Sequence, residues 1–199
     1  MITADQQPLP VPMPAESWHD AHLAAAAHTL GWRGIVLPRV QAFGDVITVV
    51  AELDDEVHAD RVRSGWPPVT DRTTIAMWSW PEHADTRPAA AMRVVGVLAT
   101  GTRWQRSVKL AAKYGGFGST ALITESARKP PQNCLLHAQY RGVGVVWAQR
   151  DGAMTMASPG RVGPVPTARP TDISRWFEEV VYECALKTGK IPAHADASS

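Results

Sequence analysis

Carboxylates gather at the end of one apolar run, where they have the chemistry of a metal site. The run Asp45–Leu53 is rich in Val and Ile and leads into the acidic segment 52–60. Hard oxygen ligands at a fixed strand end can hold Mg²⁺ for phosphodiester hydrolysis. The candidate ligands are Glu52, Asp54, Asp55 and His58.

The same acids also have a structural explanation, which their spacing favours. Asp54, Asp55 and Glu56 in succession suit the first turn of a short helix, where the helix dipole stabilises negative charge. In a strand, the adjacent Asp54 and Asp55 would point to opposite faces. A metal-dependent phosphodiesterase or nuclease using residues 52–58 is therefore the less favoured hypothesis, and we expect no cofactor.

Cations gather in the centre of the chain. Residues 103–150 hold eight bases and one acid, whereas residues 1–60 hold nine acids and two bases, so the net charge of +1 conceals a segregation. Such asymmetry indicates a surface that meets a polyanion, or two segments that attract each other. The candidate polyanion-binding cations are Arg103, Arg106, Lys109, Lys113, Arg128, Lys129 and Arg141, with Arg150 beside them.

Tryptophan is the commonest aromatic residue, with eight copies against three Phe and three Tyr. We predict a strand over Thr73–Trp80. Trp78 and Trp80 are two residues apart in it, so the two rings would lie on the same face. Two such rings can stack on nucleobases, although covering the edge of a core is the commoner role. Trp104 is a further exposed candidate.

Short apolar runs separated by Gly and Pro must position these residues. Runs rich in Val or other β-formers predict strands, and the expected ranges are 33–40, 45–53, 73–80, 92–99, 120–125, 134–140, 143–149 and 153–158. Apolar residues at helical spacing predict helices at 15–30, 102–114 and 171–188. The predicted fold is therefore α+β, with a mainly antiparallel sheet of about six to eight strands packed by an N-terminal, a central and a C-terminal helix.

The C-terminal helix has the clearest pattern. Thr171 is the expected N-cap, and an apolar stripe follows at i, i+3, i+4 and i+7 spacing. The charged side chains of this helix are expected to face water: Arg175, Glu178, Glu179 and Glu183.

The ends of the chain lack such periodicity. Four prolines between residues 8 and 14 predict a flexible Pro-rich arm over 1–14. A single α+β domain is expected over 15–188, and residues 189–199 are expected to form a disordered tail.

Two cysteines and the absence of a leader suggest a compartment. Cys134 and Cys184 fall in apolar positions, and no basic, apolar leader opens the sequence, so we expect reduced thiols in a cytoplasmic protein. No apolar run approaches the roughly 20 residues that span a bilayer, so no membrane association is expected.

These observations favour a non-catalytic accessory or regulatory binding protein. Its basic central region, 103–150, would contact nucleic acid or an acidic partner. The alternative is a protein–protein assembly module without a nucleic-acid role, including a homo-oligomer. The metal-dependent phosphodiesterase or nuclease is the second alternative.

Overall fold

A six-stranded mixed sheet forms the centre of the computed structural model, in which residues 20–101, 103–126 and 128–193 are described. The strands are adjacent in the order of the sequence. Neighbouring strands are antiparallel, except that β3 pairs parallel with β4 and β4 parallel with β5. The strand bounds are β1 Ile35–Ala42, β2 Asp45–Leu53, β3 Met92–Thr100, β4 Ser119–Glu125, β5 Gly144–Ala148 and β6 Met154–Ser158.

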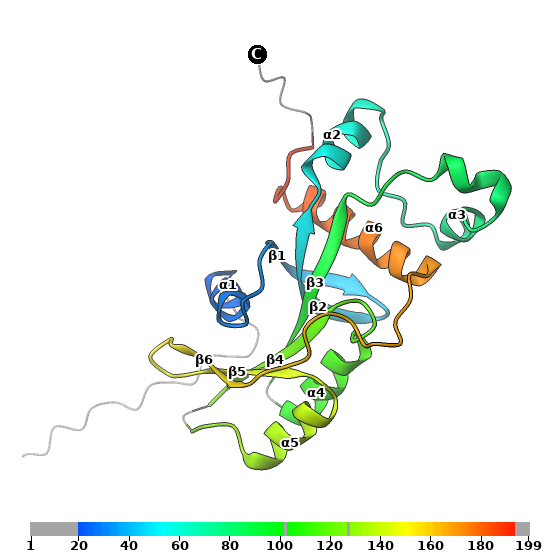
Figure 1. Ribbon diagram of the computed structural model, residues 1–199. Coiled ribbons are helices and arrows are strands. Elements are labelled where there is room, and N and C mark those ends of the chain that lie inside the picture. Colours follow the sequence, from blue (N-terminus) through cyan, green and yellow to red (C-terminus); the bar gives the residue numbers. More distant parts are fainter. Residues whose placement is uncertain (1–19, 102, 127, 194–199) are drawn as a thin grey trace, which may run out of the picture.

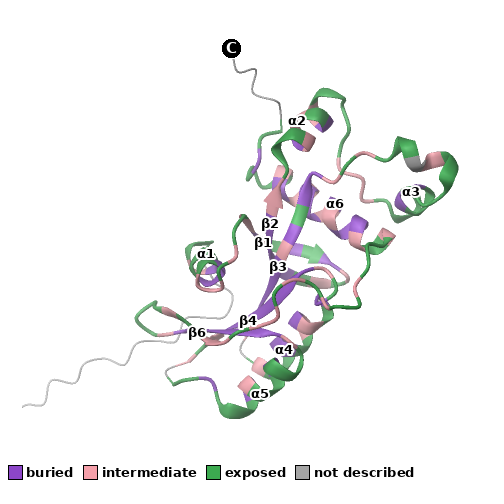
Figure 2. Cartoon of the chain, in the orientation of Figure 1, coloured by how far each residue is buried: buried purple, intermediate pink, exposed green. Residues whose placement is uncertain are grey.

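Helices cover both faces of the sheet (Figures 1 and 2). On one face α1 (Asp20–Thr29) packs through Leu23, Ala26 and Ala27 against inward residues of β2 to β5. On the other face α6 (Asp172–Lys187) covers β1 to β3, while α4 (Trp104–Lys113) and α5 (Gln132–Tyr140) cover β3 to β5. The remaining helices are α2 (Asp55–Arg63), α3 (Arg72–Met77) and the 3-10 helix Pro81–Thr86.

This architecture confirms the predicted α+β fold with a mainly antiparallel sheet and N-terminal, central and C-terminal helices. The C-terminal helix begins as expected, because the Thr171 hydroxyl accepts the backbone N–H of Ser174. The proposed arm, residues 1–14, lies outside the described residues. At the other end Ile191 is buried at 4% exposure and Lys190 pairs with Asp20, so these two residues of the predicted tail contact the domain.

The segment 134–140 was predicted as a strand and is instead the helix α5. Cys134 and Ala138, four residues apart, are both buried, and Leu, Ala and Gln favour a helix. Alternation over seven residues could not separate the two structures. The correction adds the βαβ unit β4-α5-β5 to the unit β3-α4-β4, and the two crossovers account for the parallel part of the sheet.

The segment 73–80 was also predicted as a strand and contains the helix α3. Asp71 lies directly before it, and its carboxylate accepts the Thr74 backbone N–H at 2.8 Å and the Thr74 hydroxyl at 2.7 Å. This cap overrides the strand preference of Thr, Ile and Trp. Trp78 and Trp80 therefore follow a helix rather than alternate along a strand.

A buried ionic cluster joins α2 to α6. Glu179 is 1% exposed and accepts two bonds from the Arg61 guanidinium, at 2.7 and 2.9 Å, and one from Arg175 at 2.6 Å. The expectation that Arg175 and Glu179 face water is therefore wrong. Helical periodicity placed both on the polar side of α6, but α2 and its flanking loops cover that side.

The same cluster holds two loops. Arg61 donates to the carbonyl oxygens of Pro67 and Ala89, and Arg175 donates to that of Pro88. Glu179 also accepts the backbone N–H of Val69 at 2.9 Å. Because buried charges are tolerated only when paired and hydrogen-bonded, the position of α2 depends on Glu179.

We expect the substitution Glu179→Gln to lower the free energy of unfolding by about 3–5 kcal/mol, because it leaves two buried guanidinium groups without a counter-charge. Urea unfolding followed by circular dichroism measures the change. The control is Glu183→Gln, on the same helix, whose carboxylate pairs with the exposed Lys187 and should contribute under about 1 kcal/mol. Equal losses in the two variants would contradict the role assigned to Glu179.

Two buried tyrosines, Tyr114 and Tyr182, should make the free energy of unfolding depend on alkaline pH. Burial raises the pKa of the Tyr114 phenol, with the Asp45 carboxylate adding to the effect, and burial also raises the pKa of Tyr182. Because both values lie above that of an unfolded tyrosine, their stabilising contribution is complete below about pH 10 and is lost as the pH rises further. Urea unfolding between pH 8 and pH 11 should show this loss. In Tyr114→Phe the decline should be shallower, and an unchanged slope would exclude Tyr114 as a cause.

Candidate nucleic-acid interface

The parallel strands bring several cations to one edge of the sheet. β3, β4 and β5 run in the same direction, so the segments that follow them leave the sheet at the same edge. Arg103 follows β3, Arg128 and Lys129 follow β4, and Arg150 follows β5. Positions far apart in the sequence therefore share the carboxyl edge of the parallel strands, where open α/β sheets commonly bind ligands.

Helix α4 adds cations on its outer side. Ser107, Val108 and Ala111 are buried against the sheet. Arg106 and Lys109 lie on the opposite side of the helix and are exposed. Helical neighbours three residues apart have Cβ atoms about 5–6 Å apart, so these two charges are close together.

Helix α5 brings the next basic segments nearer to each other. Arg128 and Lys129 precede α5, and Arg141 follows it. A nine-residue helix spans about 13 Å, whereas the same residues as a strand would span about 30 Å. The incorrect strand prediction therefore overestimated the separation of these cations.

We define the basic surface by seven exposed residues: Arg103, Arg106, Lys109, Arg128, Lys129, Arg141 and Arg150. None of the seven forms an ion pair with another described residue. Their charges are thus available to an anionic ligand.

Lys113, the remaining predicted cation, has a structural role. Its ammonium group donates to the Asp45 carboxylate at 2.6 Å and to the carbonyl oxygen of Phe43 at 2.9 Å. This is the one ion pair between segments 1–60 and 103–150 among the described residues. Among the described residues, these two oppositely charged segments are therefore joined by a single ion pair.

Trp78 and Trp80 lie away from the basic surface, whereas Trp104 begins α4 beside Arg103, half-buried against the core and packed on the His137 ring. Trp78 is buried at 7% exposure and Trp80 is 59% exposed, and both follow α3, which lies far from α4 and α5 (Figure 1). The aromatic side chain that accompanies the cations is Tyr140 at the end of α5, which is 90% exposed. The strand prediction for 134–140 concealed it. Its signal in the sequence is the Leu136–Tyr140 pair, four residues apart on a helix.

Helices α4 and α5 begin at the basic surface without a capping side chain. Arg103 and Pro131 occupy their N-cap positions, and neither first turn contains an acid. The first N–H groups of a helix and its dipole attract anions. Both helix ends therefore add positive potential near Arg103, Arg128 and Lys129.

The candidate metal ligands are engaged in other interactions. Glu52 pairs with Arg93, and the Asp54 carboxylate caps α2 by accepting the Val57 N–H at 3.0 Å. Asp55 is exposed in the first turn of α2, and His58 is buried with its Nδ1 2.9 Å from the Tyr182 hydroxyl. Within the described ranges, no three His, Cys, Asp or Glu side chains are grouped as metal ligands. The prediction that Asp54, Asp55 and Glu56 open a short helix is confirmed.

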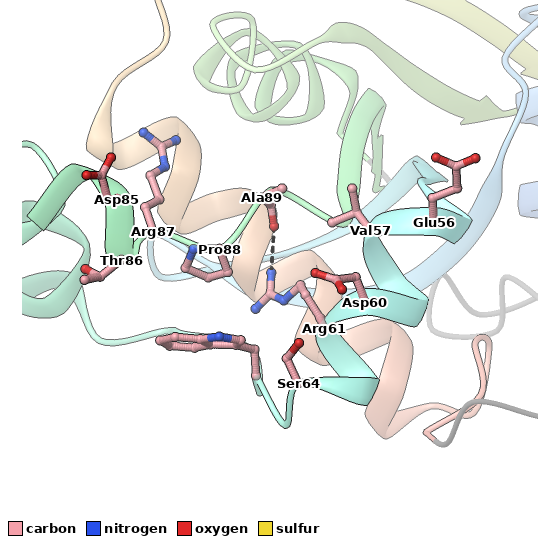
Figure 3. A pocket seen from close by; sticks show the side chains of 11 residues that line it. Glu56, Val57, Asp60, Arg61, Ser64, Asp85, Thr86, Arg87, Pro88 and Ala89 are labelled. Carbon is pink, nitrogen blue, oxygen red and sulfur yellow. Dashed lines mark hydrogen bonds between the residues drawn. The ribbon is translucent and has the colours of Figure 1, made fainter.

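A cavity of about 400 Å³ lies beside this acidic segment (Figure 3). Arg61 lines it from α2, with its guanidinium donating to the carbonyl of Ala89. The other charged or aromatic lining residues are Glu56, Asp60, Trp66, Asp85 and Arg87. The lining mixes both signs of charge, in contrast with the basic surface.

Comparison of the chain with protein-family models, with curated proteins and with solved structures gave no match. No helix in the described part of the chain has the length and apolar character needed to cross a membrane. The geometry and charge of the described side chains are therefore the basis for assigning a function.

The cap assignment of Asp54 can be tested with two substitutions. Asp54→Ala should lower the free energy of unfolding by about 1 kcal/mol, because it removes the acceptor for the Val57 N–H. Asp54→Asn should retain most of the stability, since Asn is an equally good N-cap. Urea unfolding with and without Mg²⁺ makes the comparison. An equal loss in both variants that appears only with Mg²⁺ would instead identify a charge-dependent metal ligand.

Proposed function

We propose that this protein is a non-catalytic nucleic-acid-binding protein that contacts phosphates through the basic surface. The observation that supports the proposal is the set of seven exposed cations that have no ion-pair partner among the described residues. Such a set attracts a polyanion chiefly by releasing its condensed counterions.

The distribution of the cations favours a polymer over a small anion. Arg106 and Lys109 lie one helical turn apart on α4, while Arg128 and Arg141 lie at the two ends of α5. A small phosphate compound would contact one of these groups at a time. A nucleic-acid strand carries regularly spaced charges and can contact several of them together.

The opposite charge lies at a distance. The acids of α2 lie at the upper end of the view in Figure 1, whereas α4 and α5 lie at its lower end. Phosphates approaching α4 and α5 therefore meet cations without a competing carboxylate cluster. Charge separated in this way orients a ligand during the encounter and increases the association rate at low salt.

The test is a titration of fluorescein-labelled mixed-sequence DNA by anisotropy. If four phosphates are contacted at once, the affinity should fall about 50-fold for a single strand and about 150-fold for a duplex between 50 and 200 mM salt. The double substitution Arg106→Gln/Lys109→Gln should weaken binding about 10-fold and reduce the salt dependence by about two counterions.

Two exposed cations outside the basic surface provide a matched control. Arg33→Gln/Arg169→Gln removes the same charge, and its binding should match that of the unmodified protein. Affinity that does not change with salt, or equal weakening by both double variants, would contradict the proposal. Absence of binding would leave an acidic protein partner or a role in protein assembly as the explanation, and cleavage of the DNA with Mg²⁺ would indicate a nuclease.

A further inference from the structure

We infer that the ligand is single-stranded nucleic acid and that a base stacks on Tyr140, an inference that depends on the proposed function. The basis is the position of an exposed aromatic ring beside the cations. Tyr140 is 90% exposed at the end of α5, and Arg141 follows it directly.

The outer side of α5 differs chemically from that of α4. Cys134 and Ala138 face the sheet. Leu136, 52% exposed, and Tyr140 point outward together because they are four residues apart. The other exposed residues of α5 have no formal charge when its histidine is neutral: Gln132, Asn133, His137 and Gln139. Amide groups can bond to base edges, and an apolar or aromatic surface can contact base faces.

His137 marks the side of α5 that borders α4. The His137 ring contacts Trp104 of α4, with ring centroids 5.6 Å apart. Tyr140 follows His137 by three residues and so lies close to the same side. Lys109 lies on the outer side of the neighbouring helix. A strand crossing both helices can therefore place phosphates near α4 and a base on Tyr140.

The paired helices α4 and α5 are too wide to enter a duplex groove together. α4 and α5 pack side by side on one face of the sheet. Each helix is about 10 Å wide with its side chains, so the pair is about 20 Å wide, whereas the major groove is about 12 Å wide. The two helices cannot enter the groove together, and a duplex would offer no exposed base face to Tyr140. Single-stranded bases are free to stack.

The experiment compares a labelled 20-nucleotide single strand with a duplex of the same sequence at one salt concentration. The single strand should bind more tightly. Tyr140→Ala should weaken single-strand binding about 10-fold, and Tyr140→Phe should retain it, because the aromatic ring is the contact. Duplex binding by Tyr140→Ala should change less than about two-fold. The salt dependence should stay the same, since stacking releases no counterions.

The outcomes separate this inference from the proposed function. Equal binding of duplex and single strand, or no effect of Tyr140→Ala, would overturn stacking and leave phosphate binding intact. Loss of binding to both ligands in the unmodified protein would reject the proposed function itself. Oligo-dT and oligo-U in parallel distinguish DNA from RNA. Circular dichroism controls for folding, which the exposure of Tyr140 should preserve.

Discussion

The handedness of the two crossover connections determines which face of the sheet carries α4 and α5, and therefore where the basic surface lies. Parallel neighbours in a sheet are joined by right-handed crossovers. Because β3, β4 and β5 follow one another in space, both connections pass over the same face. That constraint places α4 and α5 side by side and sends three connecting segments to one edge. This topology brings Arg103, Arg128, Lys129 and Arg150 of the basic surface to one edge, although they come from three separate segments of the chain.

The buried cluster around Glu179 plays a different part. It joins α2, α6 and the loops at Pro67 and Ala89. A buried carboxylate with two guanidinium partners is specific in geometry, because each oxygen has a defined donor. The acidic end of the molecule is thus held by internal ion pairing, whereas the basic end leaves its charges exposed to solvent.

Much of the architecture could be predicted from local pattern. Runs of Val or other β-formers identified β1 to β6, and helical spacing with Thr171 as cap identified α6. The errors occurred where a local feature competed with composition: Asp71 began α3 within a run of β-formers, and the alternation in 134–140 was too short to exclude a helix. The parallel pairing of β4 with β5 was missed as a direct consequence, because without α5 no crossover helix joins these two strands.

The sequence identified the basic residues of the candidate site but did not show which of them are paired or which lie next to each other. Seven of the eight central bases are exposed and without an ion pair among the described residues. The eighth, Lys113, pairs with Asp45 across a separation of 68 residues that no sequence window contains. The same limit applies to Glu179, whose burial depends on α2. Tyr140 could be recognised only once its segment was known to be helical.

The separation of charge has a consequence for how the molecule meets its surroundings. The formal net charge of +1 is small, and beyond about one Debye length screening by salt hides the separated charges from an approaching molecule. Within about one screening length, roughly 8 Å at physiological ionic strength, the local charge is positive near α4 and α5 and negative near α2. A negatively charged surface is attracted by the cations of α4 and repelled by the acids of α2. The orientation of the protein, more than its net charge, therefore determines whether a charged neighbouring molecule is attracted or repelled.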